Sequence, residues 1–164
     1  MPTLRGRNAV AQREAKLRAK LALVDGQGLD SEILANYARY SCILLAGFAE
    51  QSLKELLSEH ARLRASSAVH RHVEFSVNKT WGINRLKLKT LLESFDEAWY
   101  AELCETHEEH LEALQSVGKI RDSISHGSDS GITMATIIRY ADSVFELYRR
   151  LCDLIDPAPS PVAA

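Results

Sequence analysis

The sequence predicts an all-α fold, a bundle of about five to seven helices. Helix breakers are nearly absent from the body of the chain, because three of its four prolines follow Ile155. Apolar residues recur at spacings of three and four along most of the sequence, and no stretch alternates cleanly enough to form a strand. With 164 residues, of which 46% are hydrophobic, the chain is long enough for one domain with its own core.

The composition excludes several classes of protein. The three cysteines, Cys42, Cys104 and Cys152, are odd in number and widely spaced, which argues against a disulfide framework or a paired-cysteine metal site. We therefore expect free thiols and a cytoplasmic location. No apolar run approaches the roughly 18 residues that a membrane span needs. The arginine-rich N-terminus has no secretory signal and loosely resembles an organelle transit peptide, but an ordinary basic helix fits it equally well.

The first predicted unit, residues 1–28, is a basic helix followed by a turn at Gly26 and Gly28. In residues 1–24, six arginines and lysines oppose one glutamate, a net charge of +5. This charge either forms a solvated or acid-docked face, or attracts phosphates. The buried stripe is predicted to consist of Val10, Leu17, Leu21 and Val24.

The second predicted unit, residues 29–156, is a helical domain built around one long helix. Asp30 or Ser31 is a good N-cap for that helix, which we expect to run from Glu32 to about Ala65. Because it is the longest and most hydrophobic stretch, it should be the central helix of the bundle.

Gly47 lies in the middle of this predicted helix. A glycine there costs on the order of 1 kcal/mol relative to alanine, so we expect it to admit another helix, for example one from a partner subunit. Glu50 follows this small and apolar stretch. We interpret it as a carboxylate at the rim of the core rather than a catalytic group.

Residues 66–92 are predicted to hold one or two shorter helices, with Trp81 and Gly82 between them. From residue 62 to residue 90, seven basic residues oppose only Glu74, a net charge of +6. Basic and aromatic side chains together suit single-stranded nucleic acid, whose phosphates meet the charge and whose bases stack. The alternative is a helix–loop–helix with ordinary solvated lysines. The RNA-binding candidates are Arg62, Arg64, Arg71, Lys79, Arg85, Lys87 and Lys89.

Residues 93–112 carry eight acidic residues and neither lysine nor arginine, a net charge of −8. Such a surface would repel RNA and can instead neutralise the basic N-terminal helix, within the subunit or across a dimer. His107 and His110 superficially resemble a zinc-binding HExxH pair, but they stand three residues apart, with no third ligand in register. We therefore expect no metal site.

The next helix is predicted to start at an N-cap at Thr106 and to end at Gly127, a natural residue for the C′ position. After a polar turn, the last helix should run from about Thr133 to Ile155. The proline-rich tail, residues 157–164, cannot continue a helix and is predicted to be disordered.

Residues 119–127 place an arginine, a carboxylate and a histidine in the last turns of the helix that ends at Gly127. Asp122 and His126 are four residues apart and share a face, so the carboxylate is expected to orient the imidazole. Arg121 and His126 are five residues apart, which is about 140° of rotation. Directing both at one phosphate requires the helix to unwind near His126, or two copies of the helix to meet.

The three groups suit RNA cleavage. The C-terminal end of a helix favours a protonated imidazole, which is suited to acid–base work. The guanidinium holds a phosphate and stabilises its charge in the transition state. A 2′-hydroxyl can then attack its own phosphodiester without metal or cofactor. The structural alternative is a histidine that caps a helix end beside a surface Arg–Asp pair. Arg64 and His70 have a similar spacing but neither the carboxylate nor the closing glycine.

Three stretches resemble the HEPN (higher eukaryotes and prokaryotes nucleotide-binding) domain, in particular its RiboL-PSP-type subgroup. They are residues 48–57, residues 91–96, and residues 120–127 followed by 130–133. In this order they cover roughly residues 30–155. The resemblance implies a helical bundle that forms a two-fold homodimer, with the arginine–histidine motifs of both chains lining a shared cleft.

The same resemblance implies a metal-independent endoribonuclease of a prokaryotic toxin–antitoxin, abortive-infection or related defence system. RNA is then the substrate and an antitoxin protein a partner. Arg121 and His126 become the catalytic pair, and Asp122 takes the polar position after the arginine, which is often asparagine in the family. Many members are inactive, so a non-catalytic dimerisation or nucleotide-binding module is the alternative.

Overall fold

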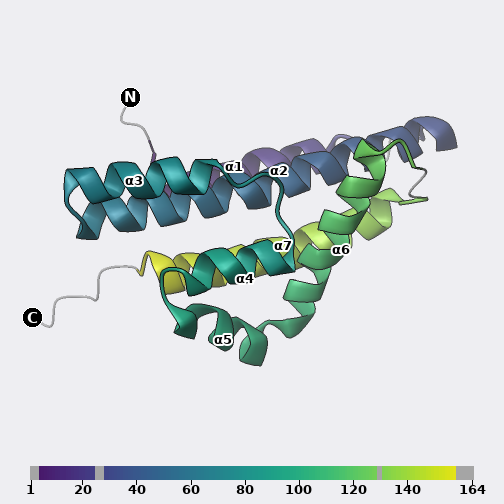
Figure 1. Cartoon of the computed structure of the whole chain (residues 1–164). Helices are drawn as coiled ribbons and strands as arrows, with labels where there is room; N and C mark the ends of the chain where they lie inside the picture. Colours follow the sequence, from purple (N-terminus) through teal and green to yellow (C-terminus); the bar gives the residue numbers. More distant parts are fainter. Residues whose placement is uncertain (1–3, 25–27, 129–130, 158–164) are drawn as a thin grey trace, which may run out of the picture.

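A computed structural model describes residues 4–24, 28–128 and 131–157, and these ranges contain seven helices and no strand (Figure 1). The predicted all-α fold is confirmed. No helix in these ranges combines the length and apolarity that crossing a bilayer requires. The helices are α1 (Gly6–Ala22), α2 (Ser31–Arg64), α3 (Ser67–Asn78), α4 (Arg85–Glu93), α5 (Glu97–Thr106), α6 (Glu108–Ser125) and α7 (Met134–Ile155).

Helix α2 is the central element, as predicted. Its 34 residues span about 50 Å, and α1, α3, α6 and α7 all pack against it. Asp30 is its N-cap, because the Asp30 carboxylate accepts the Glu32 backbone N–H at 2.8 Å. In the core, the rings of Phe48 on α2 and Phe145 on α7 pack in a T-shaped arrangement, with 5.1 Å between their centroids.

Helix α1 belongs to the same hydrophobic core, to which it contributes Val10, Leu17 and Leu21. Part of its basic charge is docked on acidic residues of α7 and its C-cap. The Arg7 guanidinium lies 2.8 Å from Asp153, and the Arg7 backbone N–H donates to the Asp156 carboxylate at 3.2 Å. The start of α1 is therefore clasped to the end of α7.

The junction between α5 and α6 differs from the prediction. Thr106 is the last residue of α5, not the N-cap of the next helix, because its hydroxyl donates to the Glu102 carbonyl at 2.8 Å within α5. The chain changes direction at His107, where φ is −134° and ψ is 31°. This bend lets α5 pack on α4 while α6 turns toward α2 and α7.

The other predicted elements fall where expected. Two short helices, α3 and α4, flank Trp81 and Gly82, and the last helix ends at Ile155. Residues 158–164 of the predicted tail lie outside the described residues, and so does Gly26 of the predicted turn.

Candidate active site

The C-terminus of α6 has the geometry that its sequence predicts. His126 is the C-cap, and Gly127 follows with φ of +74°. The Gly127 N–H donates to the Ile124 carbonyl at 3.0 Å, and the Ser128 N–H donates to the Ser123 carbonyl at 2.9 Å. These two bonds define a Schellman motif, which requires a left-handed residue that glycine adopts without strain. The predicted role of Gly127 is confirmed.

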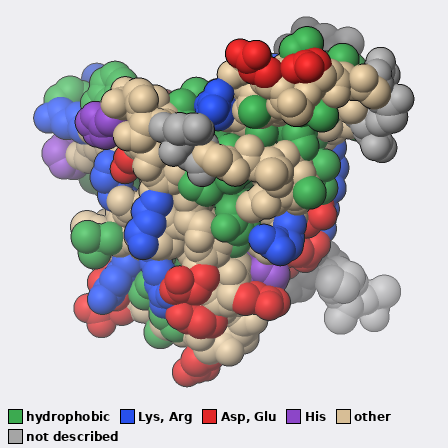
Figure 2. All heavy atoms as spheres, turned by 90° about the vertical axis from the view of Figure 1, so that its right-hand side faces the viewer, with side chains coloured by type: hydrophobic (Ala, Val, Ile, Leu, Met, Phe, Trp, Pro, Cys, Tyr) green, Lys and Arg blue, Asp and Glu red, His purple; other side chains and the backbone are tan. Residues whose placement is uncertain are grey.

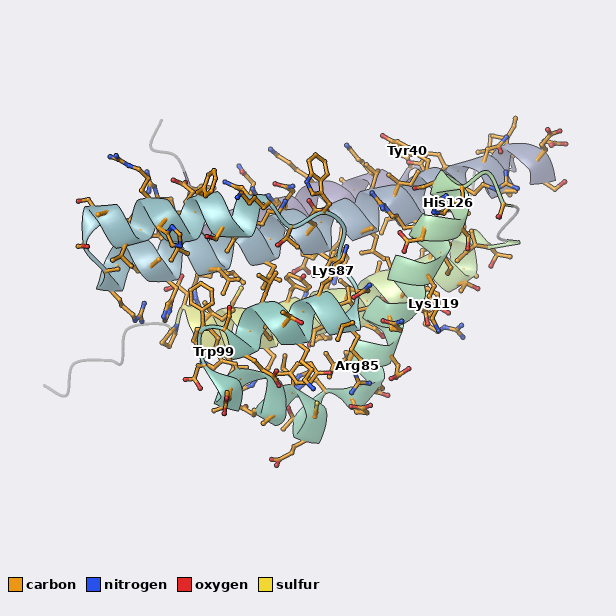
Figure 3. The ribbon with its side chains drawn as sticks, in the orientation of Figure 1. Tyr40, Arg85, Lys87, Trp99, Lys119 and His126 are labelled. Carbon is orange, nitrogen blue, oxygen red and sulfur yellow. The ribbon has the colours of Figure 1, made fainter. Side chains whose placement is uncertain are left out.

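The imidazole of His126 is exposed and makes no hydrogen bond to any residue that the structure describes. Its backbone N–H donates to the Asp122 carbonyl at 3.0 Å, but its ψ of 10° departs from helical geometry. This ψ turns the chain out of the helix after His126, and the expected side-chain pair between Asp122 and His126 is absent, because the Asp122 carboxylate pairs with Arg121 instead. Figure 3 places His126 at the end of the molecule where α2 carries Tyr40.

Arg121, rather than His126, is the partner of Asp122. One guanidinium nitrogen of Arg121 lies 3.2 Å from the Asp122 carboxylate, and the two side chains are 39% and 58% exposed. An exposed ion pair of this kind contributes only about 0–1 kcal/mol. The guanidinium can therefore exchange this carboxylate for a phosphate at little cost.

A loop between α3 and α4 lies against Arg121. A Cβ added at Gly82 would lie 3.6 Å from Arg121 Nη1 and also 3.6 Å from Lys87 Nζ, so two cations flank this glycine. Lys87 in turn donates to the Trp81 carbonyl. Among the predicted RNA-binding residues, Lys87 is thus the one that the structure brings next to Arg121.

Two residues that the sequence analysis did not assign to the site hold this loop in place. Gly118 on α6 allows the close approach, because a Cβ there would lie 2.8 Å from the Ile83 carbonyl oxygen. Glu50, interpreted as a rim carboxylate, is half-buried, and it accepts the Gly82 N–H at 2.7 Å and Lys54 at 2.7 Å. The signal for Gly118 was available: it is a costly glycine within the buried stripe of a helix.

The other predicted RNA-binding residues either lie near the turn between α2 and α3 or are engaged by neighbouring side chains. Arg64 ends α2 and Arg71 lies in α3, and both are exposed. The turn between these two helices lies at the opposite end of the molecule from the end of α6 (Figure 1). Arg62, near the same turn, is engaged by both oxygens of Glu59 at 2.7 Å. Lys79 lies over the exposed ring of Phe75, 4.1 Å from its centroid.

Arg85 and Lys89 face the acidic segment instead. The Arg85 guanidinium donates to Glu108 at 2.6 Å, to the Tyr100 hydroxyl at 2.8 Å and to Glu112. It lowers the pKa of Glu108 by this hydrogen bond. Lys89 lies 3.9 Å from Glu93. The acidic segment therefore pairs with α4 and, through Glu102 and Arg150, with α7, rather than with the N-terminal helix of this chain. Figure 2 shows basic and acidic side chains side by side in the lower part of the face that it draws.

The histidine pair of the acidic segment has no metal-binding geometry around it. The ring centroids of His107 and His110 are 5.4 Å apart. Within the described ranges, no three residues among His, Cys, Asp and Glu are grouped so that they could hold a metal ion. Desolvation by burial lowers the pKa of His107.

Comparison with known proteins relates nearly the whole chain to one family. The family model described as RiboL-PSP-HEPN matches residues 8–157, from the first turn of α1 to beyond the end of α7. Searches of curated proteins and of solved structures found no match.

Proposed function

This chain belongs to the RiboL-PSP-type HEPN family, and from that premise we propose that it is a homodimeric endoribonuclease that needs no metal ion. The observation that carries the proposal is the arrangement at the end of α6. His126 ends α6 with an exposed imidazole that has no partner among the described residues. Arg121, five residues earlier on the same helix, has a guanidinium that is only weakly paired.

The chemistry is an intramolecular displacement at phosphorus. His126 accepts the proton of a ribose 2′-hydroxyl, and the 2′-oxygen then attacks the adjacent phosphorus. The bond from phosphorus to the 5′-oxygen breaks, this oxygen takes a proton from water, and a 2′,3′-cyclic phosphate remains. Arg121 stabilises the charge that develops on the phosphoryl oxygens. Before RNA binds, Asp122 accepts a hydrogen bond from Arg121 at 3.2 Å and holds the guanidinium that the phosphate then takes over.

The rotation between Arg121 and His126 argues for a site built from two chains. Five residues on an α-helix separate the two side chains by about 140°, and only the last residue departs from helical geometry. Two copies of α6 related by a two-fold axis can present Arg121 of one subunit to His126 of the other.

One exposed face of α2 is the interface that we propose for this dimer. Its residues recur at spacings of three and four, as in paired helices. Gly47 lies in this series, and a Cβ added there would meet nothing within 4 Å. Its helix-propensity cost is therefore not offset by close packing inside the chain, which fits the predicted contact with a partner subunit. The face consists of Ile33, Asn36, Tyr40, Ile43 and Gly47.

The family also suggests the biological setting. We propose a toxin of a prokaryotic toxin–antitoxin or abortive-infection system, acting on RNA in the cytoplasm and restrained by an antitoxin protein.

The first test is cleavage of single-stranded RNA in the presence of EDTA. Arg121→Ala and His126→Ala should each lower the rate by about 10²–10⁴-fold, the usual contribution of such groups. Arg64→Ala and His70→Ala are matched controls of the same residue types and similar spacing, and they should retain the rate. An unchanged rate in His126→Ala would refute the proposal.

Mixing the two inactive variants tests the shared site. A heterodimer of Arg121→Ala and His126→Ala subunits contains one intact pair if the two residues act across the interface, and none if they act within one chain. In an equimolar mixture, half of the dimers contain one subunit of each variant, and each of these has one intact site out of two. About a quarter of the wild-type rate should therefore return. No recovery, from chains shown to exchange, would place both residues in one subunit.

A non-catalytic interaction module is the second candidate, and the Arg121–Asp122 pair favours it. In that case Arg121 and His126 stabilise the dimer or hold a nucleotide. The same substitutions should then weaken self-association measured by sedimentation, and no variant, including the wild type, should cleave RNA.

A further inference from the structure

Trp81 is the most exposed large hydrophobic side chain among the described residues, with 79% of its surface accessible. It lies in the loop between α3 and α4 and contributes nothing to the core cluster. Leaving an indole in water forgoes the burial free energy that such a ring normally supplies. A contact with something outside the chain would recover that free energy.

The backbone on which Trp81 stands is held from three sides. Lys87 donates to the Trp81 carbonyl, and Glu50 accepts the N–H of Gly82 at 2.7 Å. Ile83, two residues on, is buried, and its carbonyl lies where a Cβ at Gly118 would clash. The ring is therefore presented from a fixed position, which lowers the entropic cost of binding a ligand against it.

The same loop is where the cations of the site gather. Arg121 and Lys87 flank Gly82, the residue that follows Trp81, each 3.6 Å from the position of a Cβ there. Two carboxylates lie near these cations. Glu50 is matched by Lys54 at 2.7 Å, and Asp122 forms only an exposed, weak pair with Arg121 that a phosphate can replace. An exposed aromatic face beside a phosphate-binding pair is the combination that single-stranded nucleic acids need.

We propose that Trp81 stacks on a base of single-stranded RNA whose neighbouring phosphate lies against Arg121 and Lys87. The inference rests on the proposed function for its choice of RNA as ligand, but not on cleavage. It makes Trp81 a determinant of which RNA is accepted: a strand with an unstacked base next to the bound phosphate fits, and a duplex with its bases stacked inside does not.

The experiment uses a fluorescein-labelled, 2′-O-methylated single strand, which binds but cannot undergo attack by a 2′-hydroxyl. Anisotropy gives its Kd for the full-length protein. Trp81→Ala should weaken binding about tenfold, within the range found for removing a base–aromatic stack, whereas Trp81→Phe should keep most of the affinity. Leu86→Ala is the matched control, because Leu86 is 69% exposed on the adjacent helix but has no ring.

Intrinsic fluorescence supplies an independent reading. Of the two tryptophans, Trp99 packs against His60 and Phe95, with centroid distances of 5.1 and 6.3 Å, so the emission of exposed indole comes from Trp81. An unlabelled 2′-O-methyl single strand should quench this emission, and the same sequence as a duplex should not. The quenching should be lost in Trp81→Ala.

The outcomes separate this inference from the proposed function. Stacking stands and the ribonuclease proposal fails if Trp81→Ala weakens binding while His126→Ala cleaves normally. The inference is overturned if Trp81→Ala binds the single strand as tightly as the wild type. It is also overturned if Trp81→Ala impairs only self-association, because Trp81 would then be a protein contact.

Discussion

Two mid-helix glycines make a matched test of how the site is positioned, because the same substitution should act on them in opposite directions. Replacing either Gly118 or Gly47 by alanine gains about 1 kcal/mol of helix propensity. At Gly47 the new Cβ meets nothing within 4 Å. At Gly118 it would lie 2.8 Å from the Ile83 carbonyl oxygen and 3.1 Å from Asn84 Cβ, so backbone has to move.

The clash at Gly118 sets the magnitude. Overpacking of this kind costs about 1–3 kcal/mol, which after the propensity gain leaves Gly118→Ala destabilised by about 1 kcal/mol. Gly47→Ala should be stabilised by about the same amount. A difference of about 2 kcal/mol corresponds to about 4–8 °C in Tm for a chain of this size. Urea unfolding measures the free energy of unfolding of each variant, and repeating it at several protein concentrations separates the stability of the fold from that of the dimer.

The functional consequences should also differ. Gly118→Ala pushes Ile83 and Gly82 away from α6, so it should lower RNA cleavage and change the emission of Trp81. Gly47→Ala leaves the loop alone and should weaken only the dimer. A Gly118→Ala variant that melts at or above the temperature of Gly47→Ala would show that the loop does not depend on that close approach.

Three further predictions concern stability and reactivity. The hydrogen bonds from Arg62 lower the pKa of Glu59. The stabilisation of the fold by this pair is therefore fully present above about pH 4.3, the pKa of a glutamate in the unfolded chain, and is lost as the pH falls through the lower pKa of Glu59 in the folded protein. Urea unfolding should find Glu59→Gln destabilised by about 1–3 kcal/mol at neutral pH but not in acid; a pH-independent loss would contradict this. Gly127→Ala should lower Tm by about 2–4 °C, since a left-handed alanine costs about 1 kcal/mol, and calorimetry showing no change would argue against the Schellman cap. Burial raises the pKa of the Cys42 and Cys152 thiols to about 11, so mass spectrometry of the folded protein after iodoacetamide near pH 8 should find both far less modified than after urea unfolding, and equal labelling would contradict their burial.

The parts of the site that depend on local sequence could be predicted. The Schellman cap at Gly127 follows from one glycine after an apolar helical stripe, and the Asp30 cap from a residue type that favours this position. Both are decided within a turn of the residue concerned. The start of α6 was mispredicted because Thr106 bonds back to the Glu102 carbonyl and ends the preceding helix instead, an option that the same residue type also has.

The parts that depend on distant partners could not be predicted. In the sequence, Arg85 looks like one of several cations in a basic stretch. Its partners Glu108 and Glu112 are 23 and 27 residues further along the chain, so the pairing cannot be seen locally. Glu50 reaches the loop at Gly82 across 32 residues. The Asp122 carboxylate pairs with the adjacent Arg121 rather than with His126, and the spacing of four residues that suggested the His126 pair does not decide between these two partners.

The clasp between the start of α1 and the end of α7 has a mechanical consequence. Arg7 bonds to Asp153 and to both the backbone and the carboxylate of Asp156, so tension applied at either end of the chain loads this contact early. The clasp lies away from the end of α6 (Figure 1). An unfoldase pulling from the N-terminus would therefore open this clasp and begin to detach α1, which packs on α2 and α7, before it deforms the Arg121–His126 region. Degradation of a complex could then begin while that region is still folded and bound.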